Sequence, residues 1–323
     1  MKILVTGATG KVGSRLLHFM RSDPRFKNAS FRALCHNRSV DGVEIVRGTI
    51  ADRACVKQAL EGVSHVVHLA TCKETPEEVM DVAVKGLFWM LEEFTASKTA
   101  KQFILIGGDA AIGHFFYEHD GPITEATKHM AYPGCYALSK VLEEVMVTQF
   151  HTQYGINTCC LRAPWIMEKD DFKFTLSFGD DVFGGPVWKN LIPAEDAARY
   201  RENETIPVLL DAHGKALKRN FVHIDDLVAA IALAIDNPKT KGKTFNISMN
   251  EPVDYADVAS HLKRTFGLSS VEIPSQYHSN WMDNSAAKYA LGWRPNYDLA
   301  KLIDSAWHYK RSPDEPRKIW YPG

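Results

Sequence analysis

The sequence contains no apolar run that approaches the ~20 residues a membrane-spanning helix needs. It also lacks an excess of charge of one sign, because 38 basic and 39 acidic residues leave a formal net charge of −1. That balance gives no electrostatic reason to expect nucleic acid or an anionic membrane as a partner. The apolar run that opens the chain stops at Thr6-Gly7, too early for a signal peptide.

The six cysteines form neither a C-x-x-C metal pattern nor a dense disulfide framework. We therefore expect a protein of the reducing cytoplasm, without a metal site. Three histidines, His114, His119 and His129, share the loop before residue 136, but spacings of five and ten residues in a loop are poor metal-ligand spacing. A substrate-contacting or surface histidine is the preferred interpretation there.

Segments with the apolar patterns of strands and helices alternate through the first half of the chain. Strands are predicted at 31–36, 43–46, 63–69, 103–106 and 158–162, and helices at 53–60, 77–97 and 139–154. This alternation is typical of an α/β protein with a Rossmann-type, doubly wound parallel sheet. We expect residues 1–164 with 220–248 to form the nucleotide-binding domain. Residues 165–219, irregular in pattern, would form a smaller C-terminal substrate lobe with 249–323.

Three glycines, Gly7, Gly10 and Gly13, lie between the first predicted strand and a segment with helical apolar spacing. A glycine turn in that position lets the backbone approach a pyrophosphate, which then binds the N–H groups at the start of the helix. The alternative is a glycine-rich turn that holds no ligand. The strand before the turn and the helix after it favour a dinucleotide site.

A second motif, Tyr136-Ala-Leu-Ser-Lys140, opens another predicted helix. Residues four apart share a helix face, so the phenol and the ammonium point into the same space. A free phenol with a pKa of ~10 is a poor base at neutral pH, and a nearby ammonium favours its ionised form. Tyr136 would then serve as a general acid–base for a hydroxyl group. A surface tyrosine with a solvated lysine is the alternative.

Together these motifs resemble the extended short-chain dehydrogenase/reductase family, in its NAD-dependent epimerase/dehydratase branch. Residues 66–70, 219–226, 283–288 and 291–295 are similar to further segments of that family. The resemblance implies that Lys140 lowers the pKa of Tyr136 and holds the nicotinamide ribose. It also implies a cofactor site for NAD(P) made of Gly7, Thr9, Gly10, Lys11, Val12, Gly13, His36, Asn37, Arg38, Leu69, Ala70, Thr71, Tyr136, Lys140 and Pro164.

The same resemblance indicates where substrate would bind. In nucleotide-sugar members, the arginine that corresponds to Arg219 contacts the substrate diphosphate; a structural ion pair with Asp225 or Asp226 is the alternative. Trp165 follows the strand at 158–162 and would line the substrate wall or belong to the core. His114 is a further candidate substrate contact.

The sequence departs from the family pattern at three catalytic positions. Gly108 stands where the family has Ser or Thr, and Asp109 follows it as our candidate for the missing hydroxyl's place, with an ordinary loop carboxylate as the alternative. Ala110 replaces the glutamate of the sugar dehydratases, which disfavours dehydration. Ala83 stands where the family tends to have an asparagine that positions the catalytic lysine.

A further departure concerns the choice of cofactor. The second predicted strand is followed by His36-Asn37-Arg38, and the first acidic residue after it is Asp41. An acidic residue at this strand end binds the ribose of NAD, whereas basic residues suit the 2′-phosphate of NADP. The sequence thus leans slightly toward NADP. In the alternative, Asn37 or backbone groups bind the ribose.

These observations predict an enzyme that moves hydride between a nicotinamide cofactor and a sugar carbon, with a nucleotide-sugar epimerase favoured. A dehydrogenase or reductase of a free sugar or sugar acid is the alternative, and a dinucleotide-binding sensor without catalysis is a third class. The long helices predicted at 77–97 and 139–154 would pair two copies of the chain into a homodimer.

Overall fold

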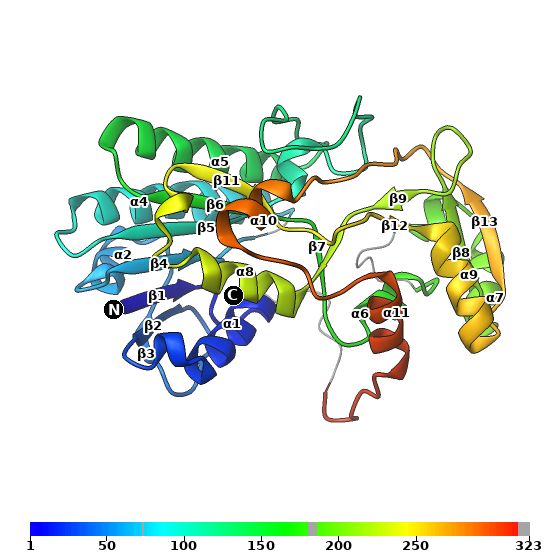
Figure 1. Cartoon of the computed structure of the whole chain (residues 1–323), viewed down its shortest axis with the longest axis horizontal. Coiled ribbons are helices and arrows are strands. Elements are labelled where there is room, and N and C mark those ends of the chain that lie inside the picture. The colour runs from blue at the N-terminus through cyan, green and yellow to red at the C-terminus, as the bar shows by residue number, and fades with distance from the viewer. Residues whose placement is uncertain (73, 180–185, 316–323) are drawn as a thin grey trace.

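The computed structural model describes residues 1–72, 74–179 and 186–315. Its largest element is a seven-stranded sheet in the order β11-β6-β5-β4-β1-β2-β3, and every pairing in it is parallel. This is a Rossmann-type sheet, as predicted (Figure 1). The strands are β1 (Lys2–Thr6), β2 (Ser30–Cys35), β3 (Glu44–Arg47), β4 (His65–His68), β5 (Gln102–Gly108), β6 (Thr158–Ala163) and β11 (Lys243–Asn246).

Helices cover both faces of the sheet, because apolar side chains of the central strands point alternately to either side. Leu4 and Phe103 pack in the apolar cluster under one helix layer, whereas Ile3 and Ile104 pack under the other. The first layer consists of α2 (Arg53–Leu60), α3 (Pro76–Val79), the π-helix η2 (Met80–Gly86), α4 (Leu87–Ala96) and α5 (Cys135–Tyr154). The second consists of α1 (Lys11–Ser22), α8 (Ile224–Ala234) and α10 (Ser285–Leu291).

The strand register brings the ends of the central strands together. Thr6 at the end of β1 lies opposite His68 at the end of β4, and His68 lies opposite Leu105 of β5. The residues that follow these strands therefore meet at one edge of the sheet, where open α/β sheets bind ligands. Gly7, Leu69 and Asp109 are such residues.

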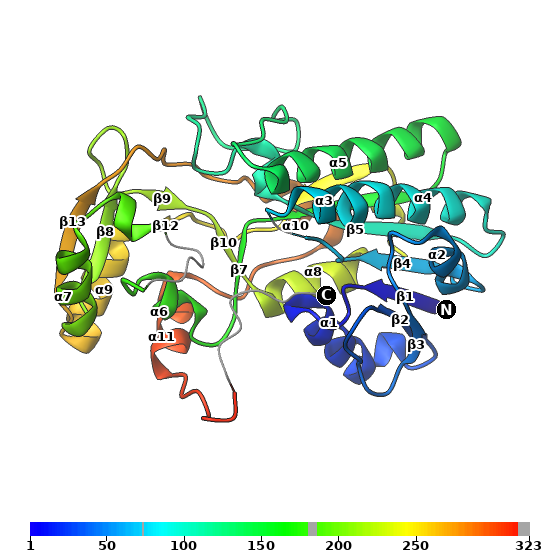
Figure 2. The same ribbon diagram turned by 180° about the vertical axis from the view of Figure 1, so that it is seen from behind.

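A second apolar cluster lies beside the sheet and holds Phe172, Phe221 and Leu262, among others. The segments around it appear on the right in Figure 1 and on the left in Figure 2. They are β7 (Trp165–Met167), α6 (Asp171–Thr175), α7 (Ala194–Glu202), β8 (Ile206–Leu210), β9 (Lys218–Arg219), β10 (Phe221–His223), β12 (Val253–Asp254), α9 (Tyr255–Phe266), β13 (Ser270–Pro274) and α11 (Leu299–His308). Short 3₁₀ turns are η1 (Pro24–Phe26), η3 (Asp109–Ile112), η4 (Trp188–Asn190) and η5 (Pro238–Thr240).

The segment 165–219, predicted to be irregular, contains regular structure. Strand β8 pairs with β13 in a parallel sheet, and α7 precedes β8. Pro207 interrupts the strand pattern of β8, and its partner β13 lies more than sixty residues along the chain, so no local signal revealed the pair. Residues 180–185 and 316–323 of the predicted substrate lobe lie outside the described residues.

Two predicted helices have different boundaries in the structure. Helix α5 begins at Cys135, four residues before the predicted start, so Tyr136 lies in its first turn. The predicted helix 77–97 is divided by the π-helix Met80–Gly86. The last residue of this π-helix, Gly86, packs closely against Ile50. A Cβ on Gly86 would lie 2.6 Å from Cγ1 of Ile50.

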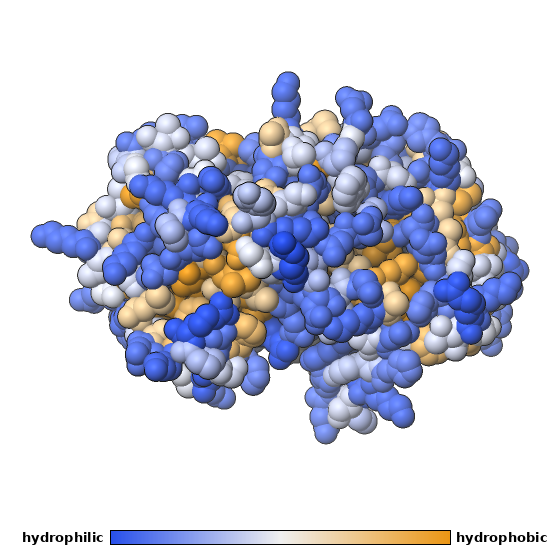
Figure 3. All heavy atoms as spheres, in the orientation of Figure 1, coloured by the Kyte–Doolittle hydropathy of each residue, from blue (hydrophilic) through white to orange (hydrophobic). Residues whose placement is uncertain are grey.

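Polar and charged side chains cover most of the face shown in Figure 3, with smaller apolar patches between them. Across the part of the chain that the structure describes, no helix has both the length and the apolar character to cross a membrane.

Candidate active site

Close contacts require glycine at one position of the turn between β1 and α1 and at one position in the first turn of α1. Gly7 has a φ of +64°, and a Cβ there would lie 2.8 Å from the amide nitrogen of Ala70. A Cβ on Gly13 would lie 2.3 Å from the carbonyl oxygen of Gly7. The loop after β4 and the start of α1 are thus packed directly against the backbone of this turn.

The start of α1 has no side-chain cap. The helix begins at Lys11 after Gly10, which has no side chain to cap the first-turn N–H groups. Those groups and the positive end of the helix dipole suit a phosphate. Thr9 lies in the turn, and Val12 packs partly against the sheet.

Thr6 joins the ends of β1 and β4 beside this turn. Its Oγ1 accepts hydrogen bonds from the backbone N–H groups of Leu69 and Ala70, both at 3.2 Å, and contacts Nδ1 of His68 at 3.0 Å. Leu69, Ala70 and the following Thr71 therefore border the glycine turn, where the sequence placed them in the cofactor site.

Lys11, at the start of α1, contacts the segment that contains β7 and α6. Its ammonium donates to Oδ2 of Asp171 at 2.5 Å and to the carbonyl oxygen of Ile166 at 3.5 Å. Both Lys11 and Asp171 are largely buried. This ion pair ties the start of α1 to α6, a role that the sequence did not predict for Lys11.

The residues His36, Asn37 and Arg38 follow β2 at the same edge of the sheet. Arg47, at the end of β3, donates to the carbonyl oxygens of His36 and Arg38 at 3.3 and 2.8 Å. Arg47 thus adds a second guanidinium to this strand end, and sequence reasoning missed it because the pairing of β3 with β2 brings it there.

Tyr136 and Lys140 lie on one face of α5, as their spacing predicts. The Lys140 ammonium is 5.6 Å from the centre of the Tyr136 ring. Glu74 contacts the start of this helix, accepting a hydrogen bond from the backbone N–H of Cys135 at 3.1 Å. Gly108, at the end of β5, faces the pair: a Cβ there would lie 3.8 Å from both the Tyr136 hydroxyl oxygen and Cδ of Lys140.

The charge around Tyr136 differs from the sequence prediction. Burial, followed by the carboxylates of Glu143, Asp109 and Glu74, raises the pKa of Tyr136 above its usual value of 10. The net shift in the cofactor-free protein is thus opposite to the lowering that the sequence predicts from Lys140. Lys140 donates to Oε2 of Glu143 at 2.8 Å, so a carboxylate offsets its charge. The i,i+3 spacing of Lys140 and Glu143 is a signal that sequence reasoning passed over.

Asp109 is buried in the turn η3 and bonded to His114, so it is not an ordinary loop carboxylate. Nδ1 of His114 contacts Oδ2 of Asp109, while Nε2 accepts from Nε1 of Trp165 at 2.7 Å and from the Arg219 guanidinium at 3.1 Å. This pattern assigns the proton to Nδ1. Burial lowers the pKa of His114, in agreement with a neutral ring.

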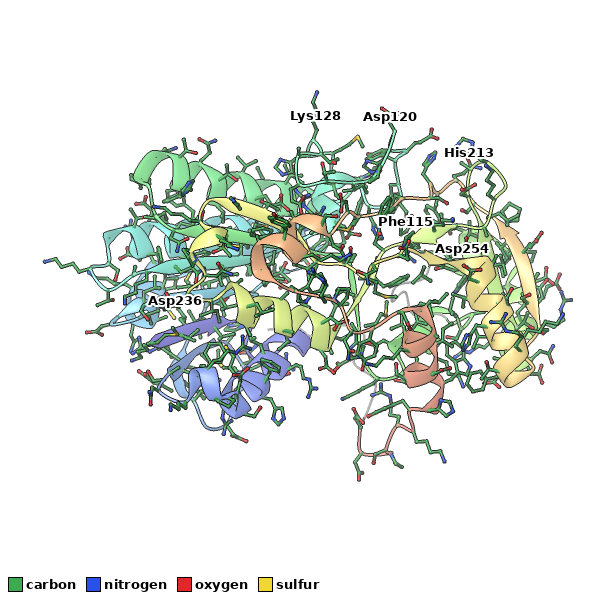
Figure 4. The ribbon with its side chains drawn as sticks, viewed as in Figure 1. Phe115, Asp120, Lys128, His213, Asp236 and Asp254 are labelled. Carbon is green, nitrogen blue, oxygen red and sulfur yellow. The ribbon has the colours of Figure 1, made fainter. Side chains whose placement is uncertain are left out.

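Arg219 is held by this histidine network and by aromatic rings. It donates to the Tyr255 hydroxyl at 3.3 Å, and its guanidinium carbon lies 4.3 Å from the centre of the Phe115 ring. Figure 4 shows Phe115 to the right of the sheet, at strand β9, which agrees with its contact with Arg219. The alternative of an ion pair with the aspartates of α8 is wrong, since Asp225 pairs with Arg15 at 2.6 Å.

Asp226 accepts instead from the backbone N–H groups of Asn296 and Tyr297. Pro164 is buried between β6 and β7, next to Trp165. The structure thus brings together Asp109, His114, Trp165 and Arg219, and it places Tyr136 and Lys140 at the adjoining end of β5.

Of the other two loop histidines, His119 has a buried Nε2 without a hydrogen-bond partner among the described residues, whereas His129 has a partner on α5. Nε2 of His129 contacts Oε2 of Glu144 at 3.0 Å, and Glu144 also binds the Arg162 guanidinium. Within the described ranges, one group of side chains could in principle hold a metal, namely the largely exposed Glu118, His213 and His278. Glu118 already pairs with His213 at 2.9 Å.

Comparison with known proteins finds relatives that include a nucleotide-sugar epimerase and a uronate dehydrogenase. A UDP-glucuronate 4-epimerase of Arabidopsis thaliana is 24% identical, over 93% of this chain and 74% of the relative. A uronate dehydrogenase of Pseudomonas putida is 25% identical, over 50% of this chain and 59% of the relative. A crystal structure of a short-chain dehydrogenase/reductase superfamily protein from Agrobacterium tumefaciens with bound NAD has a TM-score of 0.79 at 22% identity, covering 95% of this chain and 96% of that one.

One family model matches the half of the chain that carries the glycine turn and the Tyr136–Lys140 pair. The match covers residues 3–167, and the model describes the NAD dependent epimerase/dehydratase family. This match agrees with the fold, the turn and the paired side chains described above. The chain therefore belongs to the NAD dependent epimerase/dehydratase family.

Proposed function

We propose that this protein is an NAD-dependent epimerase of a nucleotide-linked uronic acid, of the kind that its UDP-glucuronate 4-epimerase relative acts on. One observation carries the proposal: the glycine turn after β1 and the Tyr136–Lys140 pair beside β5 lie at the same edge of one parallel sheet. A cofactor held by the turn would extend along this edge to Tyr136. When bound, NAD supplies the acceptor and donor of hydride.

Tyr136 is the proposed acid–base. Its hydroxyl lies at Gly108, where an added Cβ would meet no atom closer than 3.8 Å, so the reacting sugar hydroxyl has room to approach. Tyr136 would take the proton of that hydroxyl as hydride leaves the same carbon, and would return it when hydride comes back. Lys140 would hold the ribose of the cofactor.

Asp109 supports this chemistry from the other side. Because its carboxylate is bonded to His114, it is held in place at the end of β5 beside Gly108. We propose that Asp109 orients the reacting hydroxyl in place of the family's Ser or Thr. Ala110, buried next to it, offers no base for a dehydration.

Arg219, His114 and Trp165 would form the substrate wall. Arg219 is the proposed contact for the substrate's anionic group, a diphosphate or a carboxylate, because its guanidinium is fixed between His114 and the Phe115 ring. The bonds among these three side chains pre-organise the wall before substrate arrives.

For the cofactor we propose NAD, which is bound in the similar structure from Agrobacterium tumefaciens. The slight lean toward NADP, based on His36 and Arg38, finds no support in that neighbour. Titration of the protein with each nucleotide, followed by tryptophan fluorescence, tests the choice. NAD should bind at least tenfold more tightly, and Arg38→Ala should weaken NADP binding more than NAD binding.

A second candidate is an NAD-dependent dehydrogenase of a free sugar acid. The similarity to a uronate dehydrogenase over half of the chain favours it. Incubation with UDP-glucuronate and, separately, with glucuronate and excess NAD distinguishes the two. The proposed epimerase inverts C4 of the nucleotide sugar without net NADH formation, whereas the dehydrogenase forms one NADH for each free sugar acid oxidised.

Three further features belong to the proposal. The division into a nucleotide-binding domain and a substrate lobe is retained, with the cytoplasm as location. A homodimer would pair the outer faces of α4 and α5, where Phe88, Leu138 and Val145 are exposed. Light scattering tests it, and a monomer mass at micromolar concentration would contradict it.

A further inference from the structure

The catalytic helix contains an ion pair that is sealed from solvent. Lys140 Nζ donates to Oε2 of Glu143 at 2.8 Å, and the two side chains are 5% and 0% exposed. Because they are three residues apart on α5, the helix itself fixes their approach. A buried charge is costly unless it is paired, so this carboxylate and this ammonium depend on each other.

Among the described residues, the Glu143 carboxylate has no hydrogen-bond partner other than Lys140. Its second oxygen, Oε1, is buried without a hydrogen-bond partner there. The neighbouring Glu144 differs, since both of its oxygens bind Arg162 and one also contacts His129. The two consecutive glutamates of α5 thus bind different cations: Glu144 binds Arg162, and Glu143 binds Lys140.

Ala83 carries no polar group that could bind Lys140, and the partner of Lys140 comes from α5 itself. The π-helix η2 packs against α5, and its buried Ala83 carries no polar group. The side chain that the family tends to place there to hold the lysine is absent in this chain. Glu143 supplies a polar partner for Lys140 instead, and it brings a negative charge that an amide would not bring.

That charge acts on Tyr136. Glu143 stands after burial as the largest cause of the raised Tyr136 pKa. Other titratable groups facing this pair or Tyr136 are His68 on β4, Glu74 before α3, Asp109 in η3, Tyr132 before α5, Glu144 on α5 and Cys160 on β6. Lys140 is the ammonium at the centre of this group, and Glu143 offsets its charge.

We propose that Glu143 is a positioning residue for the catalytic pair: its buried carboxylate holds the Lys140 ammonium in place and offsets its charge beside the Tyr136 hydroxyl. The inference rests on the hydride-transfer function proposed above, because Tyr136 is the acid–base of that function and has to lose its own proton before it can take the proton of the sugar hydroxyl. It concerns the free protein, so it can be measured without turnover.

Two variants separate charge from shape. Glu143→Gln keeps the size of the side chain and an oxygen that can accept from Lys140, but it removes the negative charge. Glu143→Asp keeps the charge on a shorter side chain. If Glu143 acts through charge, the Gln variant is altered and the Asp variant resembles the parent; if it only fills space, the order reverses.

The direct measurement is the ionisation of Tyr136, read from phenolate absorbance in alkaline difference titrations against the matching Tyr136→Phe background. We expect Glu143→Gln to lower the pKa of Tyr136 by about one unit or more, and Glu143→Asp to leave it near the parent value. Equal titrations of the parent and Glu143→Gln, or an equal shift in both variants, would overturn the inference.

The pH profile of hydride transfer gives a second readout. In Glu143→Gln the rise of kcat on the acid side should move about one pH unit lower, because Tyr136 ionises more readily. An unmoved profile in an active variant overturns the inference and leaves the proposed function standing. A parent protein without any hydride transfer removes the proposed function, and the absorbance titration still decides the role of Glu143.

Discussion

A Cβ atom on Gly108 would lie 3.8 Å from the Tyr136 hydroxyl oxygen, so a side chain at position 108 would point at the acid–base without a clash. The backbone there is extended, with φ −145° and ψ 153°, which any residue adopts. Gly108 thus leaves room beside Tyr136 where the family usually carries a hydroxyl.

Gly108→Ser should therefore be tolerated and should raise kcat by up to about tenfold, because its hydroxyl adds one hydrogen bond to the reacting oxygen. Gly107→Ser is the matched control: its Cβ would lie 2.8 Å from Sγ of Cys160, and overpacking there should lower the free energy of unfolding by about 1–3 kcal/mol. Urea unfolding and steady-state rates measure both. If Gly108→Ser destabilised the protein as much as Gly107→Ser does, this would contradict the claim that a side chain fits at position 108.

Tyr136→Phe should lower kcat by about 10²–10⁴-fold, because it removes the group that takes and returns the proton. NAD binding should change little, since the glycine turn is untouched. Tyr132→Phe is the control, as Tyr132 is a nearby half-buried tyrosine that stacks on Phe116 at 4.5 Å. Equal rates for parent and Tyr136→Phe would favour a dinucleotide-binding sensor over an enzyme.

His114→Ala should destabilise the protein and weaken substrate binding together. The substitution leaves the Asp109 carboxylate and the Trp165 indole N–H without the histidine that bonds them, at a cost of about 1–3 kcal/mol for a buried polar group. His213, whose side chain is 58% exposed, is the control, and His213→Ala should change the free energy of unfolding by less than about 0.5 kcal/mol. Chemical denaturation measures the free energy of unfolding of both variants. Equal losses of stability would contradict a stabilising role for the hydrogen bonds of His114.

Stability should fall as the pH is lowered below 6.5. Burial lowers the pKa of His68 from 6.5 to about 3, so between these values the unfolded chain binds a proton that the folded protein does not. Unfolding is then favoured by acid, by about 1.4 kcal/mol per pH unit for this one group. His68→Asn should flatten the dependence of the unfolding free energy on pH over this range. Parallel curves for parent and variant would contradict the prediction.

Local patterns predicted the sheet and its cofactor turn well. Strand β5 and its neighbours are continuous apolar runs, and Gly7 and Gly13 are required by contacts within a few residues of the turn or across to the next strand. The Tyr136–Lys140 pair follows from helical spacing alone. These features depend on short stretches of sequence, so a single chain suffices to find them.

The missed features depend on contacts between distant segments or on burial. Strand β8 needs its partner β13, and Arg47 reaches the end of β2 from β3. The direction of the Tyr136 pKa shift could not be predicted from Lys140 alone, because it depends first on burial, then on Glu143, and then on carboxylates from η3 and from the segment before α3. The bonds of His114 to Trp165 and Arg219 likewise join residues 51 and 105 positions away.

The most direct test of the proposed function is native mass spectrometry, with an absorbance spectrum, of protein purified without added cofactor. An epimerase regenerates its nicotinamide within each turnover, so we expect a mass increase that corresponds to one tightly held NAD or NADH per chain. A protein that emerges empty and binds neither NAD nor NADP on addition would contradict the account.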